Sequence, residues 1–146
     1  MKWLEVLIVS AMPFSELRGG IPLALYLGFD PISAYVLCVL GNFAPIPFLL
    51  LTLGLIERTV SKVPIVSEIY GRIVKRTERR RDIVDKYGYF GLTLFVAIPL
   101  PVTGAWTGSL LSFLLGLDKL KSALHILLGI MVAGVIVLGT SMLALR

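Results

Sequence analysis

Two long apolar runs constrain the fold of this chain more than any other feature of its sequence. Residues 32–56 and 123–145 contain no Lys, Arg, Asp or Glu. A helix rises about 1.5 Å per residue and the hydrocarbon core of a bilayer is about 30 Å thick, so each run can cross a membrane as a helix. The whole chain is 57% hydrophobic and 16% charged, whereas soluble domains are roughly 45–50% apolar and about 25% charged. We therefore expect an all-α integral membrane protein.

The sequence also matches itself when it is shifted by 88 residues. The clearest match aligns Leu27-Gly28-Phe29-Asp30 with Leu115-Gly116-Leu117-Asp118. Two more pairs of glycines align without a gap, Gly20 with Gly108 and Gly41 with Gly129. Gly and Asp are common at turns and helix ends, so these matches are more informative than the many leucine matches. The chain is predicted to consist of two structurally related halves.

Each half has the same order of segments. A short apolar segment (3–12 or 92–100) leads into a Pro/Gly-rich break (13–22 or 99–104), a second short segment and then one of the long runs. The short segments reach only about half of the bilayer thickness. We expect each pair to form a re-entrant helical hairpin, whose broken backbone must be covered by protein or line a wet cavity. The alternative is one kinked span per pair.

The distribution of positive charges favours re-entrant hairpins and predicts which side of the membrane each segment faces. Nine of the 14 Lys and Arg residues lie between Arg58 and Lys86. If each half crosses once, Lys119 and Lys121 join that basic face, which the positive-inside rule places in the cytoplasm. We expect one membrane domain, 1–146, of two inverted repeats, each a re-entrant hairpin plus one transmembrane helix. Its parts are the first repeat (1–56), a cytoplasmic basic amphipathic helix (57–89, helical from near Pro64 to Lys86) and the second repeat (90–146).

Several functional classes find no support in the sequence. There is no P-loop, no GxSxG motif and no cluster of Cys and His that could hold a metal, so we expect no enzyme, no metal and no cofactor. The net charge of +5 is confined beside the spans, where a basic segment is more simply explained by anionic lipids than by nucleic acid.

Candidate binding residues gather in the two breaks. Glu16 and Arg18 would lie deep in the membrane, where ionisable groups are costly and mark functional sites. A carboxylate there can exchange protons or meet a cation, and an Arg can hold a carboxylate or phosphate. The alternative is a mutually neutralising pair that only holds the hairpin shape. The full set predicted to bind substrate or protons is Glu16, Arg18, Gly19, Gly20, Asn42, Thr103, Gly104, Trp106 and Thr107.

The second arm of each hairpin would begin at its tip and aim a helix N-terminus into the cavity. Unpaired N–H groups and the helix dipole make such an end an anion site. We expect one near Gly19 and Gly20, with Pro22 as an early helical residue, and another near Gly104 to Gly108. Glu16 would repel an anion unless it is protonated or paired, so its protonation could couple transport to a proton gradient.

The two breaks carry a resemblance to a known family. PFSELRGGIP at residues 13–22 and PLPVTGAWTG at 99–108 resemble the signatures of the small multidrug export protein family, which is distantly similar to the DedA membrane proteins. The resemblance implies a bacterial or archaeal cell membrane and hairpins that face each other. DedA-like proteins are associated with moving lipid phosphates in dependence on the proton gradient, which suggests Glu16 and Arg18 as counterparts of the membrane-embedded charged residues.

These observations lead to one main functional hypothesis and two alternatives. The main one is a transporter or flippase of an amphipathic, anionic, lipid-phosphate-like substrate, with proton coupling as an option. The alternatives are an exporter of hydrophobic cationic drugs, with Glu16 as counter-ion, and a non-transporting scaffold. The expected partners are the bilayer and its anionic lipids, the small substrate and protons. Four short hairpin arms and two spans make a thin wall around a cavity, so we expect at least a homodimer.

Overall fold

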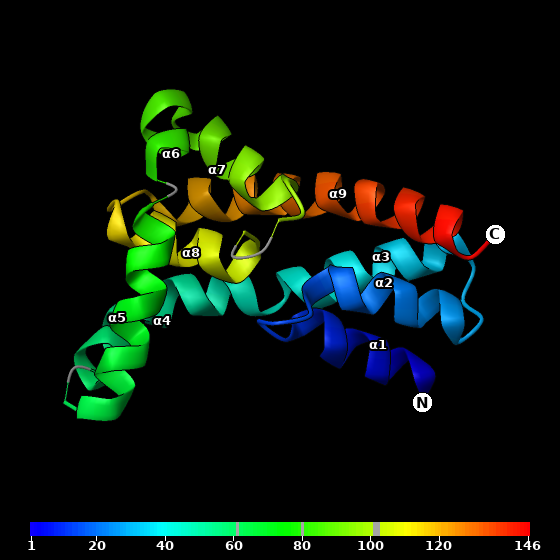
Figure 1. Ribbon diagram of the computed structural model, residues 1–146, viewed down its shortest axis with the longest axis horizontal. Helices are drawn as coiled ribbons and strands as arrows, with labels where there is room; N and C mark the ends of the chain where they lie inside the picture. Colours follow the sequence, from blue (N-terminus) through cyan, green and yellow to red (C-terminus); the bar gives the residue numbers. More distant parts are fainter. Residues whose placement is uncertain (61, 80, 101–102) are drawn as a thin grey trace.

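The computed structural model describes residues 1–60, 62–79, 81–100 and 103–146, and these ranges contain helices and no strand. The two halves are linked by a basic connection that is itself helical (Figure 1). In chain order the helices are α1 (Lys2–Ala11), α2 (Glu16–Tyr26), α3 (Pro31–Phe43), α4 (Pro45–Val60), α5 (Pro64–Glu78), α6 (Arg81–Tyr87), α7 (Tyr89–Ala97), α8 (Ala105–Leu114) and α9 (Lys119–Ala144).

Within the described residues, two helical stretches are long and apolar enough to cross a bilayer. One is Pro31–Thr59, which joins α3 to α4 over 29 residues, and the other is Lys119–Ala144, which has 26 residues. Only 39% of the apolar window of each is buried inside the protein. Large side chains such as Phe48, Leu51 and Val135 therefore face outward, where lipid is a favourable neighbour and water is not. The expectation of a membrane protein with two spanning helices is supported at this level.

The same turn occurs at the aligned positions of the two halves. Gly28 (φ +90°) and Gly116 (φ +64°) have left-handed backbones, which glycine adopts without a steric penalty. Each ends a short helix, and an Asp two residues later caps the next one. The Oδ2 atom of Asp30 accepts the N–H of Ser33 at 3.0 Å, and Oδ1 of Asp118 accepts that of Lys121 at 2.9 Å. Gly and Asp at this spacing therefore act as a paired helix stop and start.

Two local expectations differ from the structure. The first break is shorter than predicted, because α2 already begins at Glu16. Pro22 consequently lies inside α2, where it cannot donate to the carbonyl four residues before it. The bridge is two helices, α5 and α6, instead of one from Pro64 to Lys86. Within the long first run, α3 and α4 meet at Ala44, because Pro45 and Pro47 lack the N–H groups of a continuous helix.

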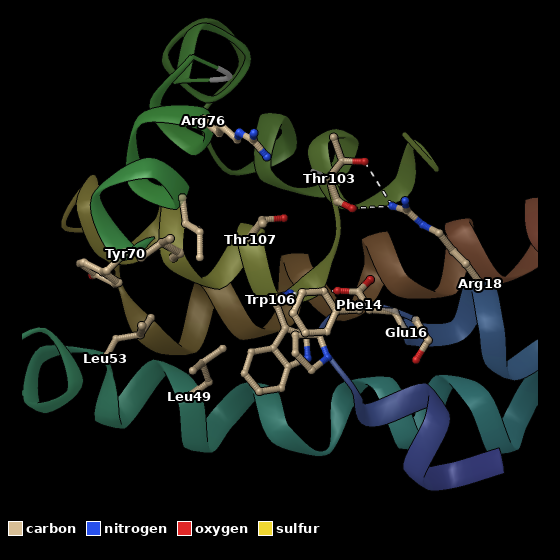
Figure 2. A pocket seen from close by; sticks show the side chains of 14 residues that line it. Phe14, Glu16, Arg18, Leu49, Leu53, Tyr70, Arg76, Thr103, Trp106 and Thr107 are labelled. Carbon is tan, nitrogen blue, oxygen red and sulfur yellow. Dashed lines mark hydrogen bonds between the residues drawn. The ribbon is translucent and has the colours of Figure 1, made fainter. Parts of the chain in front are cut away.

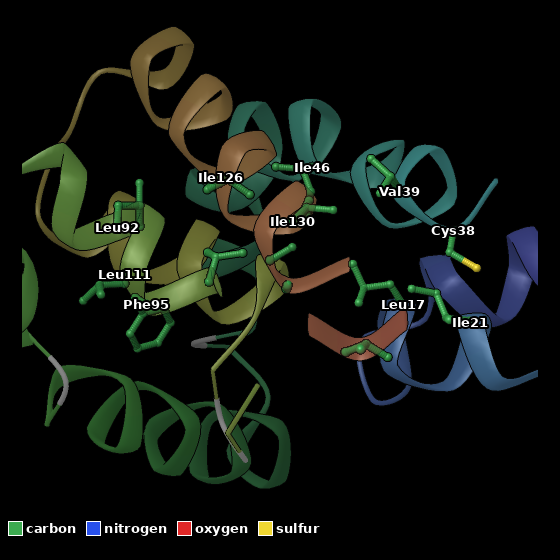
Figure 3. Packing of buried hydrophobic residues seen from close by; sticks show 14 of the residues in the cluster. Leu17, Ile21, Cys38, Val39, Ile46, Leu92, Phe95, Leu111, Ile126 and Ile130 are labelled. Carbon is green, nitrogen blue, oxygen red and sulfur yellow. The ribbon is translucent and has the colours of Figure 1, made fainter. Parts of the chain in front are cut away.

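The core joins the two halves through α9. Leu17, Ile21 and Cys38 from the first half lie at one end of the cluster, and Leu92, Phe95 and Leu111 from the second half lie at the other. Ile126 and Ile130 of α9 lie between them (Figure 3). Figure 1 shows α1 and α2 as a hairpin whose tip lies near the middle of the molecule, as do the end of α7 and the start of α8. Both chain ends lie at one end of the molecule, and α5 and α6 lie at the other.

Candidate functional site

The carboxylate of Glu16 lies at the N-terminus of α8, in the other half of the chain. Its Oε1 atom accepts the backbone N–H of Trp106 at 3.3 Å, and Oε2 accepts that of Ala105 at 3.4 Å. These N–H groups have no partner within the helix and carry the positive end of its dipole. Glu16 is 8% exposed and has a φ of +49°, which is uncommon for a residue other than glycine. The surrounding structure thus holds this carboxylate in place against a backbone cost.

The guanidinium of Arg18 binds the connection that precedes α8. One nitrogen, Nη1, donates to the carbonyl of Leu100 at 2.7 Å, and Nη2 donates to both the carbonyl and the hydroxyl of Thr103. The Thr103 hydroxyl in turn donates to carbonyls near the end of α7. Leu100 and Thr103 lie between α7 and α8, and their oxygen atoms take the place of water around the guanidinium.

No ion pair joins Glu16 and Arg18 among the described residues, although the charge of Arg18 still acts on the Glu16 carboxylate. Each charge is met by backbone groups of the second hairpin instead. A third contact runs in the opposite direction, from Trp106 Nε1 to the carbonyl of Ala11 at 3.1 Å. The two tips are therefore interlocked by polar contacts between residues that lie more than 80 positions apart in sequence.

Gly104 makes this close approach possible. Its φ of +153° is disfavoured for residues with a side chain, and a Cβ atom would lie 2.7 Å from Oε1 of Glu16. The glycines of the first break have a different role. Gly19 and Gly20 lie within α2, and Gly20 packs against Ser10 of α1 and Cys38 of α3. The helix N-terminus expected near them is at Glu16 instead.

A cavity of about 610 Å³ opens beside the interlocked tips (Figure 2). Five of the predicted residues line it: Glu16, Arg18, Thr103, Trp106 and Thr107. The other four, Gly19, Gly20, Asn42 and Gly104, are not among its lining residues. Asn42 is buried, and its Oδ1 atom has no hydrogen-bond partner in the part of the chain that the structure describes.

Other residues that line the cavity were not predicted from the sequence to belong to a site. They come from the tip of the first hairpin, from α4, from α5 and from α8, and comprise Pro13, Phe14, Ser15, Leu49, Leu53, Tyr70, Ile73, Arg76 and Leu110. Most of this surface is apolar. The helical spacing of the apolar residues of α5 was the available signal, but that pattern equally fits a helix lying on a membrane surface.

Comparison with known proteins supplies one match. A family model described as "Putative small multi-drug export protein" matches residues 16–136, which is most of the chain. The chain belongs to this small multidrug export family. It matches none of the curated proteins and none of the solved structures with which it was compared.

The family match covers residues from both hairpin tips. The matched region begins at Glu16 and includes Arg18, Thr103 and Trp106, whereas Ala11 lies before it. The family description indicates a membrane-associated export or transport protein, and the two apolar helices agree with that class. In this member of the small multidrug export family, the cavity beside the tips is the candidate site for transport.

Proposed function

We propose that the protein is a membrane transporter or flippase for a small amphipathic anion and that Glu16 couples movement to protons. One observation carries this proposal: the cavity beside the interlocked tips combines apolar walls with Glu16 and Arg18. A site of this size can hold a drug-sized ligand or one end of a lipid. Its apolar part would take a hydrocarbon chain, and its polar part a head group.

The charges beside the cavity support an anionic head group. The carboxylate of Glu16 is met by the N–H groups of α8, whereas two guanidinium groups, those of Arg18 and Arg76, line the same space. Guanidinium groups bind phosphate and carboxylate in a planar, two-pronged geometry. We therefore favour a head group such as a phosphate over a cationic one.

Proton coupling follows from the position of Glu16. A charged carboxylate occupies the anion-binding end of α8, and its two bonds are strengthened by its charge. Protonation weakens those bonds and exposes the N–H groups of Ala105 and Trp106. An incoming anion then takes the place of the carboxylate, so that proton binding admits the substrate.

The membrane arrangement belongs to the same proposal. We propose that the α1–α2 and α7–α8 hairpins are re-entrant and inverted, in the cell membrane of a bacterium or archaeon, with at least two copies of the chain together. The two ends of the chain lie opposite α5 and α6 (Figure 1), which supports a single crossing per half. The distant likeness to DedA proteins stays a prediction.

Export of hydrophobic cations is the second candidate. The cavity is lined by Phe14, Tyr70 and Trp106, and aromatic rings attract cations through their electron-rich faces. In that case the carboxylate of Glu16 would leave α8 and act as the counter-ion. A third possibility, a scaffold without transport, requires the interlock of the tips but no ligand.

Reconstitution of the purified chain in phosphatidylcholine vesicles separates these functions. Movement of a fluorescent alkyl phosphate and of a fluorescent lipophilic cation would be followed with an impermeant quencher, with and without a pH gradient. We expect protein-dependent movement of the alkyl phosphate that accelerates when the gradient is imposed. Faster movement of the cation would favour the exporter, and a folded protein that moves neither probe would favour the scaffold.

A further inference from the structure

The bridge helix α5 forms one wall of the cavity. Tyr70, Ile73 and Arg76 recur at three-residue spacing, so they lie near one another along one side of the helix, and all three line the space beside the tips. The helix packs against α8 and α4, and Tyr70 and Val74 contact the small apolar cluster of Leu49, Leu53 and Leu110. Tyr70 and Val74 are therefore directed toward protein, whereas Ile73 and Arg76 are exposed at the edge of the cavity.

Arg76 stands out among the cations of α5. Its neighbour Arg72 forms an exposed ion pair with Glu68 at 2.7 Å. Arg76 has no hydrogen bond or ion pair within the described residues, although it lines the cavity. Figure 2 shows its guanidinium across the view from that of Arg18, with Thr103 between them and Thr107 below Arg76. A guanidinium group with five unused N–H donors beside an apolar cavity is a ready partner for an anion.

Tyr70 provides a second unused polar group on the same wall. Its hydroxyl is buried and has no hydrogen-bond partner in the described part of the chain. Burial, and then the charge of Glu57, raise the pKa of this hydroxyl, so it remains a protonated donor at neutral pH. A buried hydroxyl without a partner is costly, and a shift of the Tyr70 side chain toward the cavity would let a ligand oxygen remove that cost.

We infer that Arg76 and Tyr70 of α5 form a head-group subsite that selects amphipathic anions. This inference rests on the proposed function, whose site it extends from the two hairpin tips to the bridge. Arg76 contacts the anionic head group from the side opposite Arg18, and Tyr70 donates to one of its oxygens. Leu49, Leu53 and Leu110 receive the apolar part of the same ligand. The bridge helix is then a binding element in addition to a basic surface for lipid.

The test is binding to the purified full chain in phosphatidylcholine nanodiscs, measured by calorimetry. The probes are dodecyl phosphate, inorganic phosphate and dodecyltrimethylammonium. Wild type should bind dodecyl phosphate more tightly than either of the other two. Arg76→Gln should weaken that binding at least about tenfold, which corresponds to about 1.4 kcal/mol. Tyr70→Phe should weaken it less, and Arg76→Lys should restore part of the loss because it restores the charge.

Lys75→Gln is the matched control, because it removes the same charge from the adjacent residue of α5, which does not line the cavity. It should bind like wild type, and unchanged thermal unfolding of every variant would exclude misfolding as the cause. Equal losses in Lys75→Gln and Arg76→Gln, or no loss in Arg76→Gln, would overturn the subsite. Equal binding of inorganic phosphate would overturn the claim that the ligand is amphipathic, and tighter binding of dodecyltrimethylammonium would overturn selection of anions.

The subsite and the transport function can fail separately. Binding that depends on Arg76, in a protein that moves no alkyl phosphate across vesicles, would support the subsite and remove the transporter. Movement of alkyl phosphate at the wild-type rate in Arg76→Gln would support the transporter and exclude the subsite.

Discussion

Glu16 and Arg18 are two residues apart in sequence, yet each binds backbone groups of the second hairpin. The carboxylate accepts from the first N–H groups of α8, and the guanidinium donates to carbonyls that follow α7. The carboxylate therefore complements the positive end of α8, and the guanidinium is satisfied by oxygen atoms of the chain between α7 and α8. At the scale of single residues, these contacts explain how the two ionisable groups are accommodated without an ion pair between them.

Substitution of Gly104 should disturb this arrangement. An Ala at this position would keep a disfavoured φ of +153°, and its Cβ would lie 2.7 Å from Oε1 of Glu16. We expect Gly104→Ala to lower the free energy of unfolding by about 1–3 kcal/mol. Gly139→Ala is the matched control, because a Cβ there meets no atom within 4 Å. Thermal unfolding in detergent measures both, and equal stability of the two variants would contradict the proposed contact.

At the scale of helices, several helix ends could be predicted, whereas the position of α5 beside the hairpin tips could not. The Gly and Asp residues at 28, 30, 116 and 118 mark helix ends through their own backbone and side-chain chemistry, and the structure has them there. The start of α2 at Glu16 was missed, because the Pro- and Gly-rich sequence indicated a longer break. Arg76 was missed because its nearness to the hairpin tips depends on the packing of α5 against α4 and α8, which no local pattern encodes.

The orientation of the helices gives a topology prediction. Single cysteines at positions 2, 78 and 146, in a Cys38→Ser background, would be exposed to an impermeant thiol reagent in intact cells. We expect labelling at 2 and 146 and none at 78, because the basic residues around α5 favour the cytoplasm. Labelling at 78 with silence at both ends would contradict the orientation. Positions 2 and 78 on the same side of the membrane would favour one kinked span per hairpin.

At the scale of the whole molecule, the two halves meet at one place. α9 joins their apolar cores, the polar contacts of Glu16, Arg18 and Trp106 join their tips, and the cavity lies beside that junction. A rearrangement that opens the tips would therefore change the cavity at the same time. The proposed proton-coupled transport depends on this link between a titratable carboxylate, the interlock of the tips and access to the cavity.

The most direct test of that link compares wild type with Glu16→Gln in vesicles. The measurement is the movement of an alkyl phosphate with and without a pH gradient. Gln keeps the shape of the side chain and cannot titrate, so the variant should fold and insert like wild type. Its thermal stability should be somewhat lower, because its amide can accept from only one of the two N–H groups of α8. We predict that wild type moves the alkyl phosphate faster when a pH gradient is imposed and that Glu16→Gln loses this acceleration. Full, gradient-dependent movement in Glu16→Gln would contradict the account, because the carboxylate would then be dispensable.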